Sequence, residues 1–157
     1  MHRHKYIFYF ATLFVFILDQ GTKYLVSSHM IPGQSWDPIP ALGWIFSITY
    51  TANTGMAFGL FPDAGTFLVL VAFVVIVTIL LYYRHLPRGN LWLQISLGMQ
   101  LGGALGNLAD RLRLGHVIDF IDFHFWPVSN IADGCMVFGV LLLAYHLLRD
   151  GALTNDG

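Results

Sequence analysis

Two aspartates in the second half of the chain are the residues best suited to chemistry. The 157 residues include nine aspartates and no glutamate, so any carboxylate chemistry must come from aspartate. Asp119 lies in Gly-His-Val-Ile-Asp-Phe, and Asp133 lies one turn into an apolar stretch. If their carboxyl groups meet, like charges hold one proton between them and the pair titrates as a unit. The ionised member can then take a proton from water while the protonated member donates to a carbonyl, as in aspartic proteases. Distance along the sequence leaves that contact open.

The composition places these aspartates in a membrane protein. Hydrophobic residues make up 56% of the chain and charged residues only 11%, whereas soluble domains carry roughly 25% charged residues. Too few charges are present to cover a water-facing surface, so lipid must be the main solvent. A net charge of −1 offers nothing to attract nucleic acid. The length predicts a single membrane-embedded domain over residues 1–157.

Four apolar stretches are long enough, or nearly so, to cross a hydrocarbon core, which takes about 20 helical residues. The first is expected to be an anchored helix, because no Ala-x-Ala-like cleavage site follows it and three more stretches come after it. We therefore predict an integral membrane all-α bundle of four transmembrane helices, with spans at Tyr6–Val26, Thr66–Tyr83, Leu91–Leu108 and Ile131–Leu148.

The basic residues orient this bundle. An even number of spans puts both termini on one side together with Arg84 and Arg88, whereas residues 27–65 contain no lysine or arginine. Five basic residues then lie on the side of the termini and three on the other. The positive-inside rule therefore places the termini in the cytoplasm and the segments 27–65 and 109–130 at the outer face.

The first outer segment contains a predicted strand. Phe46, Ile48 and Tyr50 alternate with polar residues, which is the period of a half-buried strand. Trp36 and Trp44 lie nearby, and tryptophan favours the membrane–water interface. We therefore expect a small β-sheet cradle on the outer surface of the membrane.

Polar side chains from five separate stretches converge at this outer face. The first helix runs outward, so Asp19 lies about 20 Å along it, and Lys23, one turn further on, can pair with Asp19. The third span ends in Gly-Asn-Leu-Ala-Asp-Arg, and the fourth begins with Asn-Ile-Ala-Asp. An aspartate inside a membrane helix usually faces a cavity or a partner. Topology alone therefore gathers at one depth the polar residues Asp19, Asn53, Asn107, Asp110, Asp119 and Asp133.

The third span also carries a pattern for close packing. Gly98, Gly102 and Gly106 recur at four-residue spacing, which lets neighbouring helices approach closely. This face continues into the polar end of the span. There Asp110 and Arg111 cannot face each other as sequence neighbours, so each is expected to reach another element.

Taken together, these motifs resemble those of bacterial lipoprotein signal peptidase, or signal peptidase II. The resemblance runs from the first span to the fourth. Its motifs are Asp19-Gln-Gly-Thr-Lys23, Asn53-Thr-Gly-Met-Ala-Phe58, Gly102-Gly-Ala-Leu-Gly-Asn-Leu-Ala-Asp-Arg111, Gly115-His-Val-Ile-Asp-Phe120 and Trp126-Pro-Val-Ser-Asn-Ile-Ala-Asp133. Each motif alone is weakly specific, whereas all five in this order are highly specific.

The resemblance implies an aspartic endopeptidase of the bacterial cytoplasmic (inner) membrane that is sensitive to globomycin and uses no cofactor or metal. Its implied partners are membrane lipid and prolipoproteins, which the family cuts before a cysteine carrying diacylglyceryl. We expect a monomer. The family's catalytic dyad falls on Asp119 and Asp133. Its supporting and substrate-positioning residues fall on Asp19, Lys23, Asn53, Asn107, Asp110, Arg111 and Asn130.

Two positions beside Asp133 depart from the family pattern. Ser129 stands where an aromatic residue is common, and Gly134 stands where serine is common. We expect altered packing or substrate fit at these positions, with the chemistry retained.

Other chemistries find less support in the sequence. A metal site is conceivable in His116–His124, but its two aspartates would point to opposite faces of a strand, and no HExxH motif is present. No G-x-S-x-G motif occurs, and Cys135 is expected to be a packing residue.

A proton- or ion-coupled carrier needs polar groups near the midplane and access from both sides, whereas the second span has almost no polar residue. His29 and His146 have no evident partner and are expected at the membrane interfaces.

Overall fold

A computed structural model of the chain describes residues 6–55, 65–85 and 90–154. Within these residues the chain forms four α-helices: α1 (Ile7–His29), α2 (Gly65–His85), α3 (Leu91–Leu114) and α4 (Ile131–Thr154). Each predicted span falls on one of them, and α3 continues six residues past its predicted span. Arg88 of the predicted inner loop and residues 56–58 of the second family motif lie outside the described residues.

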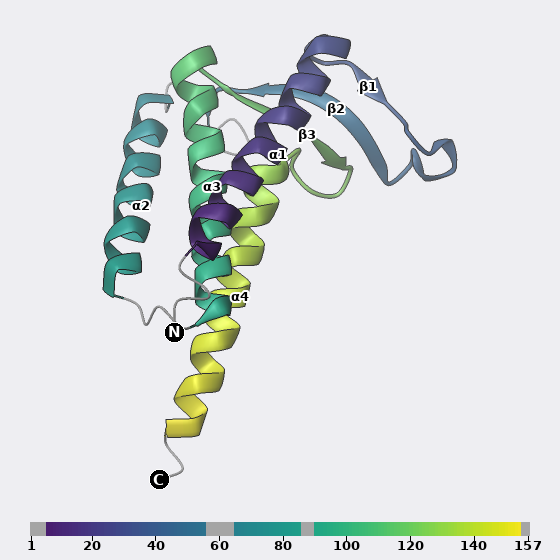
Figure 1. Cartoon of the computed structure of the whole chain (residues 1–157). Helices are drawn as coiled ribbons and strands as arrows, with labels where there is room; N and C mark the ends of the chain where they lie inside the picture. Colours follow the sequence, from purple (N-terminus) through teal and green to yellow (C-terminus); the bar gives the residue numbers. More distant parts are fainter. Residues whose placement is uncertain (1–5, 56–64, 86–89, 155–157) are drawn as a thin grey trace.

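The sheet lies at one end of the helices, beside the last turns of α1 (Figure 1). Among the described residues it has three antiparallel strands in the order β1 (Ser35–Trp36), β2 (Phe46–Asn53) and β3 (Val117–Phe123). The short helix η1 (Pro40–Leu42) joins β1 to β2. The predicted combination of four helices with a small sheet is therefore confirmed.

The predicted alternation along β2 holds over only part of the strand. Ser47 and Tyr50 are both buried although they are three residues apart, because the pairing with β3 is irregular between Ile48 and Thr51. An irregularity of this kind changes which side chains face one surface of the sheet. Beyond it, Thr51 pairs with Asp119.

Helix α3 is the centre of the bundle and packs against each of the other three helices. A Cβ atom added at Gly98 would lie 2.8 Å from the carbonyl oxygen of Phe8, and one at Gly102 would lie 2.6 Å from that of Thr12. Both contacts are closer than side chains allow, so the glycine pattern does bring α1 against α3. Apolar side chains fill the same region, namely Phe8, Ile76, Ile79, Leu97, Leu101 and Ala104.

The outward surfaces of the helices are apolar. Phe10 and Ile17 on α1 are 71% and 59% exposed, and Leu141 on α4 is 62% exposed. Exposed apolar surface of this extent fits a lipid environment. By length and hydropathy alone, two helices of the described chain qualify as membrane spans, α2 and residues Ile131–Arg149 of α4. Helices α1 and α3 are less apolar because they carry the polar residues of the site.

An asparagine cap marks the beginning of α3. The Asn90 side chain accepts hydrogen bonds from the N–H groups of Trp92 and Leu93 at the start of α3. His146 is buried and contacts the side chain of Asn90, so the expectation that His146 lacks a partner is wrong. This contact ties α4 to the beginning of α3. His29 is exposed, and its Nδ1 lies 2.9 Å from the carbonyl oxygen of Leu25.

Candidate active site

A buried ion cluster joins α1 to α3. The Lys23 ammonium lies 2.8 Å from Asp19 Oδ2 and 2.8 Å from Asp110 Oδ2, and all three side chains are at most 3% exposed. Burying a charge is costly unless it is paired and hydrogen-bonded, and here each charge has its partner. The expected pairing of Asp19 with Lys23 is present, and Asp110 reaches across to α1 as expected.

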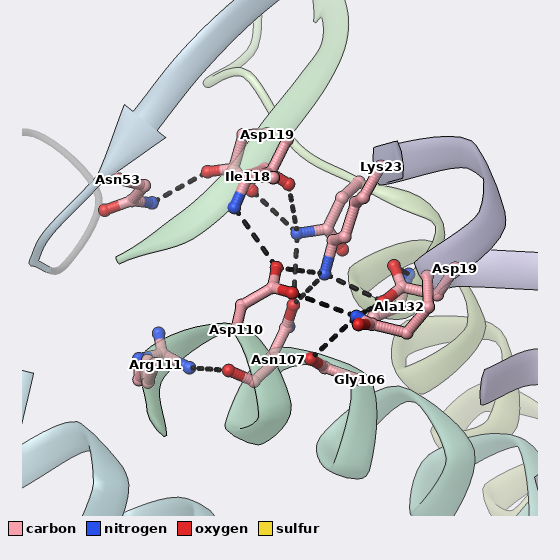
Figure 2. A network of polar contacts seen from close by, with 12 residues as sticks. Asp19, Lys23, Asn53, Gly106, Asn107, Asp110, Arg111, Ile118, Asp119 and Ala132 are labelled. Carbon is pink, nitrogen blue, oxygen red and sulfur yellow. Dashed lines mark hydrogen bonds and ion pairs between the residues drawn. The ribbon is translucent and has the colours of Figure 1, made fainter. Parts of the chain in front are cut away.

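The two carboxylates of this cluster also hold the backbone beside the two candidate catalytic residues (Figure 2). Asp19 Oδ1 accepts a hydrogen bond from the N–H of Ala132 at 3.0 Å, next to Asp133. Asp110 Oδ2 accepts one from the N–H of Ile118 at 3.2 Å, next to Asp119. Lys23 thus links the two carboxylates that accept hydrogen bonds from the backbone of β3 and α4. These two elements carry Asp119 and Asp133.

The sheet register brings Asn53 to Asp119. Thr51 of β2 pairs with Asp119 of β3, so Asn53, two residues further along β2, is its diagonal neighbour on the same face. Asn53 Nδ2 donates to Asp119 Oδ2 at 2.8 Å. The Asp119 side chain is almost fully buried, although it lies outside the membrane helices.

Two further asparagines connect the two aspartates. Asn130 directly precedes α4; its Nδ2 donates to Asp119 Oδ1 at 2.6 Å, and its Oδ1 accepts from the N–H of Asp133 at 2.9 Å. Asn107 Nδ2 donates to Asp133 Oδ1 at 2.7 Å, and its Oδ1 accepts from Lys23 at 2.9 Å. Asn130 also donates to Asn107 at 3.1 Å. The two carboxylates therefore belong to one network.

Burial raises the pKa of Asp119 to about 6, and the nearby charge of Asp133 acts in the same direction. The hydrogen bonds from Asn53 and Asn130 and the charge of Lys23 oppose this rise in pKa. Electrostatic coupling between the two aspartates is the property that the predicted acid–base pair requires.

Both aspartates line one open cavity of about 980 Å³. The cavity lies between β2, β3, α2, α3, α4 and the segment that joins β3 to α4, and Leu68 of α2 contributes to its wall. Arg111 also lines it, with its Nη1 3.4 Å from the Asn107 carbonyl oxygen. This hydrogen bond lies within α3, whereas the charge of Arg111 interacts with Asp133 of α4 and Asp119 of β3, so Arg111 reaches other elements by its charge.

All nine residues predicted for the site lie in this connected network: Asp19, Lys23, Asn53, Asn107, Asp110, Arg111, Asp119, Asn130 and Asp133. They come from α1, β2, α3, β3 and the beginning of α4, as the predicted convergence required.

Sequence reasoning missed Gln20 and His124. Gln20 Nε2 donates to Asp110 Oδ1 at 2.9 Å and to the Gly106 carbonyl at 3.2 Å, and its Oε1 accepts from Arg113. An amide inside an otherwise apolar membrane helix is a signal that could have identified it. His124 lines the cavity and lies 2.8 Å from the Ser47 hydroxyl, a contact that only the pairing of β2 with β3 reveals.

The two positions that depart from the family pattern differ in their surroundings. Ser129 lines the cavity, and its carbonyl oxygen accepts hydrogen bonds from Phe120 and Ile121 of β3. A Cβ atom added at Gly134 would meet no described atom within 4 Å. A change in packing is therefore not found at Gly134, whereas Ser129 can alter the wall of the cavity.

Four apolar-surfaced helices, with two coupled carboxyl groups in a cavity beside a surface sheet, define a membrane-embedded peptidase of the aspartic class. Comparison with known proteins agrees. Residues 11–149 match the family described as Signal peptidase (SPase) II. The chain is 44% identical to the lipoprotein signal peptidase of Moorella thermoacetica over 90% of this chain and 92% of that one. It is 42% identical to that of Bacillus velezensis over 96% and 99% of the two chains.

Solved structures show the same fold. A bacterial membrane enzyme determined by the in meso method at 2.3 Å resolution superposes with a TM-score of 0.86. It is 32% identical in sequence, and the match covers 96% of this chain and 94% of that one. The chain belongs to the signal peptidase II family and is an aspartic peptidase of the bacterial membrane.

Proposed function

We propose that Asp119 and Asp133 are the catalytic pair of this chain, a lipoprotein signal peptidase that cleaves signal peptides from lipid-modified prolipoproteins. The observation that carries the assignment is the network in which Asn130 binds Asp119 through its Nδ2 and the Asp133 N–H through its Oδ1. Two electrostatically coupled carboxyl groups on one cavity wall are what general acid–base hydrolysis of a peptide requires.

The reaction follows from one proton held between the two groups. The ionised carboxylate takes a proton from water, and the water oxygen forms a bond to the scissile carbonyl carbon. The carbonyl oxygen receives the electron pair of its double bond and a proton from the second carboxyl group. In the collapse of this tetrahedral diol, the first group returns its proton to the leaving nitrogen and the second regains one from a hydroxyl. The carbon–nitrogen bond then breaks, giving a carboxylic acid and an amine.

The position of the cavity favours a substrate held in lipid. We place the cut immediately before a cysteine that carries diacylglyceryl, because such a chain is anchored in the membrane beside this bond. Both the membrane helices and the sheet line the cavity, so the bond can reach the two aspartates without drawing its acyl chains into water. Leu68, Val117 and Val128 supply apolar side chains to the wall of the cavity.

The site is assigned to the outer face of the cytoplasmic membrane, with both termini in the cytoplasm, on the basis of the basic residues. We expect the chain to act as a monomer, because one copy supplies all nine residues of the network and their hydrogen bonds and ion pairs close on one another.

The decisive experiment is cleavage of a diacylated prolipoprotein by purified wild type and by Asp119→Asn and Asp133→Asn. Each substitution removes one titrating group, so we expect cleavage to fall about 10³-fold or more. Wild-type cleavage should release an intact signal peptide and stop on addition of globomycin. Substrate whose cysteine lacks diacylglyceryl is the control for lipid dependence. Near-normal turnover by either variant would contradict the assignment of Asp119 and Asp133 as the catalytic pair. It would not affect the membership of the chain in the family.

A further inference from the structure

Gln20 connects the surface of the bundle to the buried ion cluster. Its Nε2 group donates to Asp110 Oδ1 at 2.9 Å and to the Gly106 carbonyl oxygen at 3.2 Å, whereas its Oε1 accepts from Arg113 Nη1 at 3.2 Å. A guanidinium can only donate, and a carbonyl or an ionised carboxylate can only accept. These three contacts on α3 therefore determine which end of the Gln20 amide faces Asp110.

Gln20 holds one of the two oxygens of Asp110. The other oxygen, Oδ2, binds the Lys23 ammonium at 2.8 Å and accepts from the N–H of Ile118 at 3.2 Å (Figure 2). The last side-chain torsion of an aspartate is broad, so a carboxylate that is held through one oxygen alone can rotate. Contacts at both oxygens fix the plane of the carboxylate and thereby the direction of its hydrogen bond to Ile118.

Neighbouring residues of α1 thus act on the two elements that carry the catalytic pair. Asp19 accepts a hydrogen bond directly from α4, at the N–H of Ala132. Gln20 acts on β3 indirectly, through the carboxylate that binds the N–H of Ile118. Ile118 is buried, and the next residue along β3 is Asp119. A loss of the Gln20 amide is therefore expected to loosen the backbone beside Asp119.

We propose that Gln20 is a positioning residue for hydrolysis: by holding Asp110, it keeps the backbone beside Asp119 in the place that the reaction needs. The proposal rests on the catalytic pair proposed above and adds a residue that acts on it from a distance. Gln20 is not among the described residues that line the cavity. Its loss should therefore lower kcat, which depends on the alignment of the reacting groups, and leave KM nearly unchanged.

The charges around Gln20 suit a neutral amide. The charged groups of its network are Asp19 and Lys23 of α1, Asp110, Arg111 and Arg113 of α3, Asp119 of β3 and Asp133 of α4. Gln20 Nε2 lies 2.9 Å from Asp110 Oδ1 and 3.3 Å from Asp19 Oδ2, so it faces two carboxylates. An amide donates to them without adding charge, whereas an ionised carboxylate in its place would repel both.

The test compares kcat for prolipoprotein cleavage by Gln20→Met, Gln20→Glu and the wild type over a range of pH. Gln20→Met keeps the length of the side chain but removes both hydrogen-bonding groups, so kcat should fall about 10-fold or more at every pH. Gln20→Glu keeps an acceptor for Arg113 and places a second oxygen against Asp110. When ionised, this carboxyl group repels Asp110, and when protonated it donates a hydrogen bond to it. The ratio of its kcat to that of the wild type should therefore rise several-fold as the pH falls from about 8 to about 5.5.

Gln34→Glu is the matched control for the added carboxyl group. Gln34 is exposed in the outer segment, and its Oε1 accepts from the N–H of Ile31 at 3.1 Å, a hydrogen bond that a carboxylate also accepts. Its kcat relative to the wild type should not change with pH. Arg113→Met, at an exposed position, removes only the contact at Gln20 Oε1 and should lower kcat by a smaller factor than Gln20→Met. Melting temperatures in detergent micelles show whether each variant is folded in the assay.

A lower kcat with KM nearly unchanged, together with recovery in acid for Gln20→Glu but not for Gln20→Met, supports the proposal. A kcat ratio for Gln20→Glu that stays constant with pH overturns it, because a donor to Asp110 then has no effect on the rate. An unchanged kcat for folded Gln20→Met overturns it as well. If Gln20→Met does not fold, the pH dependence of Gln20→Glu and the kcat of Arg113→Met decide. The catalytic pair is judged separately by Asp119→Asn and Asp133→Asn, so the two proposals can fail independently.

Discussion

Asp119 is held between opposing influences. Burial and the charge of Asp133 favour its protonated form, whereas Asn53, Asn130 and Lys23 favour the ionised form. The balance leaves its pKa at about 6, against an ordinary value of 3.8. A group poised near the working pH can exchange protons in both directions during one catalytic cycle. The raised pKa of Asp119 also makes the stability of the folded protein depend on pH, independently of activity.

We predict that the stability of the wild type relative to Asp119→Asn falls as the pH rises from about 4 to 7. The pKa of Asp119 is raised on folding, so between pH 4 and 6 the folded protein binds more protons than the unfolded chain. The stabilisation is fully present below the unfolded pKa and is lost as the pH rises through the folded pKa. Because Asp119 is almost fully buried, the rise of its pKa to about 6 corresponds to roughly 2–3 kcal/mol of stability that is lost over this interval.

Thermal unfolding of both proteins in detergent micelles, at a series of pH values, measures this difference. The comparison with Asp119→Asn cancels the titrating groups that do not interact with Asp119, and a constant offset from the lost hydrogen bonds does not affect the slope. A relative melting temperature that rises over the same interval would indicate a lowered pKa and contradict the burial argument.

At the scale of elements, periodicity and span length located the helices, β2 and the end of the bundle at which polar residues gather. The end of α3 was harder to predict, because its last six residues include Asp110, Arg111 and Arg113 and so do not look like part of an apolar span. The irregularity in β2 depends on pairing with β3, which no local pattern encodes. The sequence alone could not predict the contacts of Gln20 or the backbone hydrogen bonds of Asp19 and Asp110. These contacts depend on how α1 packs against α3 and α4.

The approach of α1 to α3 controls the geometry of the site, and Gly106 is where the two meet. A Cβ atom added there would clash with Asp19 Oδ2, the oxygen that binds Lys23. We predict that Gly106→Ala displaces Asp19, lowers the free energy of unfolding by roughly 1–3 kcal/mol, and reduces kcat for prolipoprotein cleavage.

Melting temperature and kcat, measured on the same preparation, test this prediction. Gly134→Ala in α4 is the matched control, since the same added methyl group has no described neighbour within 4 Å and should change neither quantity much. Equal behaviour of the two variants would show that Asp19 moves aside freely and that its position does not matter to the site.

For the whole molecule, the ion pairs and asparagines of the site gather where α1, α3 and α4 meet the sheet, whereas much of the outward surface of the helices is apolar. This asymmetry follows from the cost of placing polar groups in hydrocarbon. It confines water, and hence hydrolysis, to one face of the membrane. Which face of the membrane this is depends on the orientation of the chain in the bilayer. The distribution of basic residues predicts that orientation.

We predict that the sheet faces the outside of the cell and that the end of α4 faces the cytoplasm. Cys135 is the single cysteine, so Cys135→Ala gives a background into which Asp37→Cys, beside β1, and Arg149→Cys, near the end of α4, can each be introduced. Both positions are exposed and lie outside the catalytic network.

In spheroplasts, a membrane-impermeant maleimide should label the first variant at once and the second only after the membrane is permeabilised. Each variant should first be shown to cleave prolipoprotein, so that labelling reports the native fold. The opposite labelling pattern would place the cavity on the cytoplasmic side, where the positive-inside argument does not allow it.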